Sequence, residues 1–300
     1  MKEQDTRTAP YTDLACERMQ ADTTLPGVEY HEEEREGFRI GHLTVMSSEG
    51  AEAIGKPEGH YTTLFFPPIY RMDEGALLPL ARVLSSLILS FCEGIGAPRS
   101  VLAVGLGNRA MTADAVGPAS IEKMIATRHL AIEEPALFGK FGKVELSLLA
   151  PGVLGDTGIE SGDLVAGAVA AISPDVVLVI DALAARSTER LAATVQLSDT
   201  GIRPGSGVGN ARRALDKESL GVPVLALGMP TVVDSATLVR DAFEQADIPE
   251  SEIPEKLFRV LREGRSFFVS PRECDVLTER AARLFGDAVN MTFSPGFFGE

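Results

Sequence analysis

The sequence has no tryptophan, and histidine and cysteine are rare, which leaves few side chains for metal sites or disulfides. The three cysteines form no CxxC pair and are odd in number, so they indicate neither a disulfide framework nor a structural zinc site. His129 lies 15 residues beyond Asp114, and on one helix that spacing is roughly 22 Å, too far for a shared metal. No metal and no cofactor are therefore predicted. The residues concerned are Cys16, Cys92, Cys274, His31, His42, His60 and His129.

Positive charge and long apolar runs are also scarce. The chain carries 28 lysines and arginines against 43 aspartates and glutamates, a formal net charge of -15. Such a surface repels phosphate, and no basic run offsets it, so direct binding to nucleic acid is not predicted. The first 25 residues hold no signal-peptide core, and no segment reaches 18 uninterrupted apolar residues. These absences predict a protein of a reduced, cytoplasmic compartment with no membrane partner.

What the sequence does contain is apolar residues, 45% of its 300, which is enough for a sizeable core. Residues 1–35 are polar, and their acidic run at 32–36 is typical of a solvated loop that adds little to a core. The segments FRIGHLTVM and HYTTLFF predict a small N-terminal β excursion. A buried helix is predicted at about 75–93, where the chain is apolar nearly all round.

The clearest pattern begins at Ser100. Four short runs rich in Val and Leu alternate with helical stretches, and this alternation predicts βαβ units in a doubly wound, mostly parallel sheet flanked by helices. The predicted fold class is therefore α/β. In such sheets the ligand site lies beyond the carboxyl ends of the strands. The strand-like runs are SVLAVGLGN, KVELSLLAPG, DVVLVIDAL and PVLALGMP, and the helical stretches are 114–129, 160–172 and 231–246.

Two of the strand-like runs lead to an aspartate. VLAVGLGN is followed by a turn that presents Asp114, and VVLVI delivers Asp181 from the end of an apolar strand, so both acids are expected at one edge of the sheet. An ionised carboxylate there costs several kcal/mol to desolvate unless it is hydrogen-bonded or used. Each acid could instead be an ordinary helix cap. As a pair they fit a hydrolase, in which one ionised acid takes a proton from water and the other, protonated, polarises the carbonyl or protonates the leaving amine.

Two glycine-rich segments could suggest a phosphate site. The first, GLGNRA, fits the GxGxxA form, but helical character starts only near Asp114 and the next strand ends in Ala-Pro-Gly rather than in an acid. The second, at 198–213, lacks Gly-Lys-Ser/Thr, and Ser206 is not in GxSxG because position 204 is proline. A nucleotide site is therefore not predicted. The second segment is either a turn-rich surface loop or a mobile loop against which an extended peptide can lie.

Many of these segments, in this order, closely resemble the germination proteases of spore-forming bacteria. The resemblance spans about residues 11–238, and its most specific parts are IDALAAR and SDTGIRPGSGVGN. The other matching segments are YTDLACE, GAEAIGK, VLAVGLGN, TADAVGP, TRHL, APGVLGDTGIESGD and LGVPVLALGMPTVVD.

The resemblance implies an endopeptidase, made as a self-processing zymogen, that starts the degradation of the small acid-soluble proteins coating spore DNA. It puts the catalytic aspartates at Asp114 and Asp181, without a cofactor, and implies a fold similar to the hydrogenase maturation endopeptidases, a homotetramer and a site of action in the spore core. Residues 1–35 then include a short propeptide, and 36–300 form a single peptidase domain. The insertion that typical members have after Gln245 is replaced by a short linker, which affects the expected tetramer contacts more than the chemistry.

The resemblance also indicates a processing site and residues that read the substrate. TDLACE resembles the acid, large apolar, alanine order of the family's cleavage sites, so self-cleavage is expected between Asp13 and Leu14, in a polar segment that we expect to be mobile. The alternative is the start of a surface helix. Cleavage beside acidic residues requires local positive charge, for which Arg203 and then Arg186 are the candidates, although Arg186 could equally be a structural partner of Glu189 or Asp181.

Two other interpretations stay open. A hydrogenase-maturation-like, metal-probing peptidase would need a histidine after a strand to complete a nickel site, and the expected α/β core offers none. A catalytically silent binding module of the same fold requires only that both acids be helix caps. Metal content and the placement of the two carboxylates distinguish the three interpretations.

Overall fold

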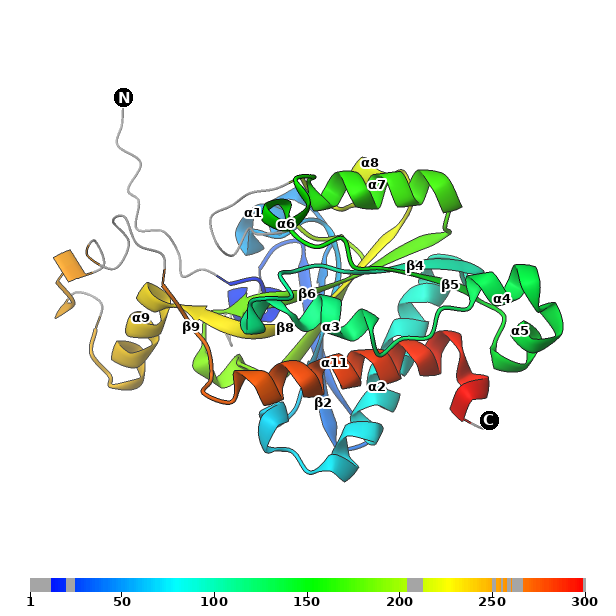
Figure 1. The fold of residues 1–300 in the computed structure, drawn as a ribbon. Helices are drawn as coiled ribbons and strands as arrows, with labels where there is room; N and C mark the ends of the chain where they lie inside the picture. Colours follow the sequence, from blue (N-terminus) through cyan, green and yellow to red (C-terminus); the bar gives the residue numbers. More distant parts are fainter. Residues whose placement is uncertain are drawn as a thin grey trace.

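A nine-stranded mixed sheet runs through the part of the chain that the structure describes (Figure 1). The structure is a computed structural model, and it describes residues 12–19, 25–203, 213–249, 252–254, 256–257, 260 and 267–298. The strand order is β1-β2-β3-β7-β8-β6-β4-β5, with β9 paired to β8. Helices flank the sheet on both faces, so the predicted α/β class is confirmed.

One half of the sheet is parallel. It consists of β5 (Glu145–Leu149), β4 (Ser100–Gly105), β6 (Val176–Ala185) and β8 (Val224–Asp234), side by side in that order. These strands form at the four Val- and Leu-rich runs of the sequence. Such runs suit strands that are covered on both faces, because neither face then needs polar side chains.

The other half is antiparallel, which the sequence pattern did not predict. β1 (Val28–Arg35), β2 (Phe38–Val45), β3 (Gly59–Phe65) and β7 (Thr194–Ser198) continue the sheet from β8, and β9 (Phe268–Val269) pairs with the far end of β8. The sheet is therefore mixed rather than mostly parallel. The expected β excursion is also not separate, because its two strands, β2 and β3, belong to the same sheet.

β1 occupies the acidic run that was expected to be a solvated loop. The strand forms because it pairs with β2 along its whole length, although most of its side chains are exposed. Glu36 and Gly37 join the two strands, and both have positive φ (53° and 81°), which matches the twist of a hairpin. Exposed charges on an edge strand discourage pairing with another chain. The boundary predicted between the polar N-terminal segment, residues 1–35, and the peptidase domain, residues 36–300, lies at this turn.

Two layers of helices enclose the parallel strands (Figure 1). α2 (Glu74–Gly94), α3 (Val116–Ile121) and α11 (Cys274–Phe293) pack into the larger apolar cluster on one face. α7 (Ser161–Ile172) packs into a smaller cluster on the other. The site described below depends on which of these faces a side chain of β6 points to.

The alternation along β6 assigns Asp181 to the α7 face. Leu178 and Ile180 belong to the cluster with α2 and α11, whereas Val177 and Val179 belong to the cluster with α7. Successive side chains of a strand point to opposite faces, so Asp181 follows Val177 and Val179.

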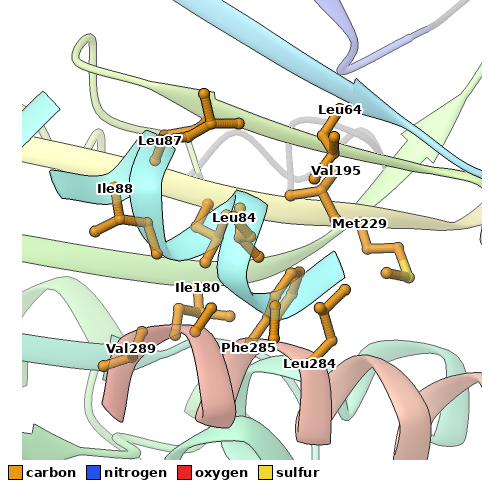
Figure 2. Packing of buried hydrophobic residues seen from close by; sticks show 14 of the residues in the cluster. Leu64, Leu84, Leu87, Ile88, Ile180, Val195, Met229, Leu284, Phe285 and Val289 are labelled. Atoms are coloured by element: carbon orange, nitrogen blue, oxygen red, sulfur yellow. The ribbon is translucent and has the colours of Figure 1, made fainter. Parts of the chain in front are cut away.

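The predicted helix at 75–93 is confirmed as α2, which packs against α11 (Figure 2). Leu84 of α2 lies close to Phe285 of α11 and to Ile180 of β6 in this view, and all three are fully or almost fully buried. α2 is long and apolar enough to pass for a membrane span, but the core helix of a folded domain passes the same test, and 44% of its apolar window is buried. Packing accounts for its composition.

The prediction of one helix over 114–129 is wrong. The chain instead forms a 3-10 turn, η3 (Thr112–Asp114), then the short α3, and after a break α4 (Arg128–Glu133). At the break, the hydroxyl of Thr127 donates to the carbonyl oxygen of Val144 (2.8 Å), next to β5. This bond holds the connection between α3 and α4 against the sheet. A continuous helix would lead the chain away from the sheet.

The other two helix predictions hold, one of them only in part. α7 confirms the helix at 160–172. Residues 231–234 continue β8, and α9 (Ser235–Gln245) begins after Asp234, whose carboxylate accepts the N–H of Thr237 at 3.0 Å as an N-cap. The remaining short elements are α1 (Ser48–Ile54), α5 (Pro135–Phe141), α6 (Leu154–Thr157), α8 (Lys217–Leu220), η1 (Ala15–Arg18), η2 (Ile69–Arg71), η4 (Thr188–Arg190) and η7 (Pro295–Phe298).

Candidate active site

Asp181 lies inside β6, at the point where its neighbour β4 ends. The last paired residue of β4, Gly105, is opposite Ile180, so Asp181 is the first residue of β6 beyond the carboxyl end of β4. The strand continues to Ala185, so the expectation that Asp181 ends its strand is wrong. Asp181 is 8% exposed, and its Oδ1 accepts the backbone N–H of Ala182 (2.9 Å). A buried carboxylate in an apolar strand is costly, which is typical of a group retained for function.

The helix-cap interpretation does not account for either acid. The 3-10 turn that follows β6 is capped by Ser187, whose hydroxyl oxygen accepts the N–H of Glu189 (3.2 Å). α3 is preceded by Ala115, which makes no side-chain cap bond. Asp114 instead closes the loop after β4, because its Oδ2 accepts the backbone N–H of Asn108 (2.7 Å).

The loop that carries Asp114 lies against the strand that carries Asp181. The backbone N–H of Leu106, just after β4, donates to the carbonyl oxygen of Ile180 (2.8 Å). Gly117 packs so tightly against the carbonyl oxygens of Leu106 and Ile180 that a Cβ there would overlap both. The two acids therefore come from different elements to the same edge of the sheet, beyond the end of β4.

A cavity of about 510 Å³ opens on the same side of the sheet, next to Asp181. Its floor includes Leu183 of β6 and Gly228 of β8, and Gly228 is the register partner of Asp181. Arg203, expected to read the substrate, also lines it. Asp114 and Asp181 are not among its lining residues within the described chain, so the acids lie beside this cavity rather than in its wall.

The N-terminal segment 12–19 lies against this cavity, which Thr12, Asp13 and Arg18 help to line. Leu14 and Ala15 are 0% exposed, so the expectations of a mobile segment and of little core before residue 36 are wrong here. Leu14 belongs to an apolar cluster with Leu183 and Val233 on the Asp181 side of the sheet. A 3-10 turn, η1, does begin at Ala15, but it is buried at its start, unlike the surface helix considered as the alternative.

Hydrogen bonds fix the expected cleavage site, Asp13–Leu14, beside β6. The backbone N–H of Asp13 donates to the carbonyl oxygen of Ala184 (2.9 Å), and the N–H of Ala184 donates to Oδ2 of Asp13 (2.8 Å). Further along, Glu17 accepts the backbone N–H of Arg186 (2.7 Å) and of Ser187 (2.9 Å). Residues 13–17 are therefore held against the end of β6 by hydrogen bonds, as a bound peptide would be held.

Two residues that the sequence analysis did not single out hold the carbonyl group of Asp13. Lys56 Nζ and Gln196 Nε2 both donate to its oxygen, at 2.8 Å and 3.2 Å. Burial lowers the pKa of Lys56, while the negative charge of Asp13 acts in the opposite direction. The available signals were weak: Lys56 ends the GAEAIGK segment, and Gln196 is a lone amide within the buried strand β7.

The two candidate arginines differ in their surroundings. Arg186 donates to Oε2 of Glu244 (2.6 Å), an acid other than the two, Glu189 and Asp181, that the sequence suggested as structural partners. Arg203 lines the cavity, at the start of the glycine-rich segment. Positions 204–212 of that segment lie outside the described residues. Substrate reading by either arginine stays a prediction.

Metal-ligating side chains do not gather in the described part of the chain, where no group of three histidine, cysteine, aspartate or glutamate residues could hold an ion. Two histidines of the N-terminal strands pair with acids: His60 contacts Asp199 (2.7 Å) and His42 contacts Glu33 (3.3 Å).

Comparison with known proteins identifies the family. The sequence model described as germination protease matches residues 10–246. The chain belongs to the germination protease family. The germination protease of Caldanaerobacter subterraneus subsp. tengcongensis is 37% identical over 95% of this chain and 94% of its own length, and that of Clostridium perfringens is 36% identical over 96% of each chain. The protein is thus a protease, a hydrolase of peptide bonds.

The germination proteases differ in how much of their length aligns with this chain. The Priestia megaterium protein is 42% identical over 73% of this chain but only 60% of its own length.

Among solved structures, a NiFe hydrogenase maturation protease from Thermococcus kodakarensis KOD1 aligns with this germination protease. It covers 66% of this chain and 94% of its own, with 17% identity and a TM-score of 0.36. A likeness at that level says nothing about metal binding or activity.

Proposed function

We propose that this germination protease is an endopeptidase that starts the degradation of small acid-soluble spore proteins, and that Asp114 and Asp181 activate the water that attacks the peptide bond. The observation that supports the proposal is that the loop after β4, which carries Asp114, lies against β6, which carries Asp181, at one edge of the sheet. Asp181 is buried, and a carboxylate in such a place is costly unless it is hydrogen-bonded or used.

The chemistry divides between the two acids. The ionised acid takes one proton from water, and the resulting hydroxide adds to the carbonyl carbon. The protonated acid gives its proton to the leaving nitrogen as the carbon–nitrogen bond breaks, and the new carboxyl group keeps the second water proton until it ionises. Asp181 is our preferred general base, and Asp114 is its partner.

The zymogen part of the proposal concerns the bond between Asp13 and Leu14. Leu14 packs on Leu183, two residues from Asp181 on the same strand and the same face, which supports processing within the chain. Arg203 and Arg186 are proposed to read acidic side chains of substrates supplied by other chains. Arg203 is the stronger candidate because it lines the cavity.

The remaining proposals concern the assembly and its surroundings. We expect a homotetramer in the cytoplasm of the spore core, without direct contact to DNA or to a membrane. The net charge of -15 supports the first of these exclusions, because it repels phosphate.

The test is incubation of the purified full-length protein with a purified small acid-soluble spore protein, followed by mass spectrometry of the products. We expect one or a few cuts next to an acidic residue, unaffected by chelators. An intact substrate would refute the proposed function. Stoichiometric nickel or zinc in the protein, with activity lost on chelation, would instead favour the metal-probing peptidase.

A further inference from the structure

Two side chains hold the backbone carbonyl group of Asp13. Its oxygen accepts two side-chain hydrogen bonds, from Lys56 Nζ (2.8 Å) and from Gln196 Nε2 (3.2 Å). These donors come from the end of α1 and from β7, so two separate parts of the chain converge on one backbone oxygen. Leu14 could pack in its apolar cluster without either of these two hydrogen bonds.

Gln196 binds the backbone on both sides of Leu14. Its Nε2 donates to the carbonyl oxygen of Asp13, and its Oε1 accepts the N–H of Ala15 (2.6 Å). A single amide thereby makes the two bonds that a neighbouring strand would make to an extended peptide. Leu14 is the residue that lies between these two contacts.

We propose that Lys56 and Gln196 hold the Asp13–Leu14 bond for self-cleavage, with both donors directed at the oxygen that becomes negatively charged. This inference rests on the proposed self-processing of the zymogen and assigns its two further catalytic residues. Neither residue transfers a proton. The water proton goes to the ionised aspartate, and the Leu14 nitrogen leaves with the proton of the other.

The physical basis is the charge that develops during the reaction. When water adds to the Asp13 carbonyl carbon, the oxygen carries a full negative charge, and hydrogen bonds to it become stronger than in the uncleaved peptide. A lysine amino group and an amide that already point at this oxygen need no rearrangement at that moment. Both donors therefore stabilise the intermediate more than the starting peptide.

The surroundings of the Asp13–Leu14 bond also explain which side chains fit on either side of it. The Asp13 carboxylate accepts the N–H of Ala184 (2.8 Å), and Leu14 is enclosed by Leu183, Leu191 and Val233. An acidic residue followed by a large apolar one therefore fits here. Ala184 is three residues beyond Asp181, about 10 Å along β6.

The experiment measures the rate of N-terminal processing in full-length variants. Lys56→Met and Gln196→Leu should each slow self-cleavage by about 10²-fold, which is the usual effect of removing one donor to an oxyanion. Lys56→Arg keeps a cationic donor and should recover at least a tenth of the wild-type rate. Lys140→Met and Gln245→Leu, exposed residues on α5 and α9, serve as matched controls and should process normally.

A second measurement detects the hydrogen bond itself in an uncleavable Asp181→Asn background. With carbonyl-¹³C aspartate and ¹⁵N leucine, only the pairs Asp13–Leu14 and Asp163–Leu164 give correlation signals in the full chain. Loss of a donor in Lys56→Met should move the Asp13 carbonyl signal upfield and leave that of Asp163, in α7, unchanged. This readout does not require an active enzyme.

The outcomes separate the inference from the proposed function. If the wild type cuts a spore protein and processes itself, but Lys56→Met and Gln196→Leu process at the wild-type rate, the inference is wrong and the function stands. A wild type that cuts the spore protein but never processes itself overturns it in the same way. A wild type that cuts neither refutes both. If one of the two variants, Lys56→Met or Gln196→Leu, does not fold, the Asp13 carbonyl shift is measured in the other. An unchanged shift there contradicts the proposal.

Discussion

At the scale of single residues, Asp114 and Asp181 have different structural duties in addition to their proposed chemistry. Asp114 closes the loop after β4 through Asn108, whereas Asp181 is embedded in β6 beside the apolar core. Asparagine keeps an oxygen that can accept the same hydrogen bonds, so the exchange removes the acid without removing the acceptor. The pair is therefore suited to a test that separates chemistry from folding.

We expect Asp114→Asn and Asp181→Asn each to reduce peptidase activity by about 10²-fold or more, because an amide cannot transfer the proton. Thermal unfolding of both variants should stay close to the wild type. Asp156→Asn, at an exposed position on α6, is the matched control and should retain full activity. Wild-type turnover in either active-site variant would remove that residue from the mechanism.

Gly107 is the residue that allows the Asp114 loop to close. Its φ of 121° is unfavourable for other residues, and a Cβ there would overlap the carbonyl oxygen of Asp114. We expect Gly107→Ala to destabilise the fold by more than about 1 kcal/mol and to displace Asp114, with loss of activity. Urea unfolding and a peptidase assay measure the two effects.

Gly221→Ala is the control for this prediction. Gly221 also has positive φ (74°), but a Cβ there would have no neighbour within 4 Å. Its cost should therefore be limited to the backbone strain of about 1–2 kcal/mol. If Gly107→Ala kept full activity, the tight closure of the loop would not matter for the site.

At the scale of elements, the sequence predicted the parts of the sheet that are buried on both faces. The runs that became β4, β5, β6 and β8 are apolar because helices cover them, and such runs are recognisable without a partner. β1 could not be predicted in this way. Its exposed acidic residues resemble a loop, and it is a strand only because β2 supplies hydrogen bonds from elsewhere in the chain.

The candidate site was predictable to the same extent. Asp114 and Asp181 follow recognisable strands, so their shared edge could be expected from the rule for parallel sheets. Lys56 and Gln196 could not, because their role depends on an N-terminal segment that packs against β6 and β7 from more than 40 residues away. The polar composition of residues 1–35 concealed the burial of Leu14.

The packing of α11 on α2 gives a prediction at this scale. Phe285 of α11 is 0% exposed and belongs to the larger cluster together with Leu84 of α2 and Ile180 of β6 (Figure 2). Phe285→Ala should lower the free energy of unfolding by about 3–5 kcal/mol, because it removes buried apolar surface and leaves a cavity. Val276→Ala, on the same helix but 39% exposed, should change it by less than about 0.5 kcal/mol. Equal effects in urea unfolding would contradict the assigned core.

At the scale of the whole molecule, the N-terminal segment determines how self-processing should depend on concentration. Asp13 pairs with Ala184, and Glu17 with Arg186 and Ser187, all within one chain. The bond between Asp13 and Leu14 is therefore delivered to its own β6 rather than to a neighbour's. A tethered site of this kind has an effective concentration near the millimolar range, far above that of free protein in an assay.

Self-cleavage should accordingly be first order. We expect the half-time of processing at mildly acidic pH to be constant over about a 100-fold range of protein concentration, with the new N-terminus at Leu14. A tagged Asp181→Asn chain mixed with active wild type should stay uncut at this position, because its own segment covers the bond, while the wild type in the same tube is processed. A rate that rises in proportion to concentration, or cutting of the tagged chain at the wild-type rate, would show that the bond is cleaved between molecules and that the docking of residues 12–19 does not guide it.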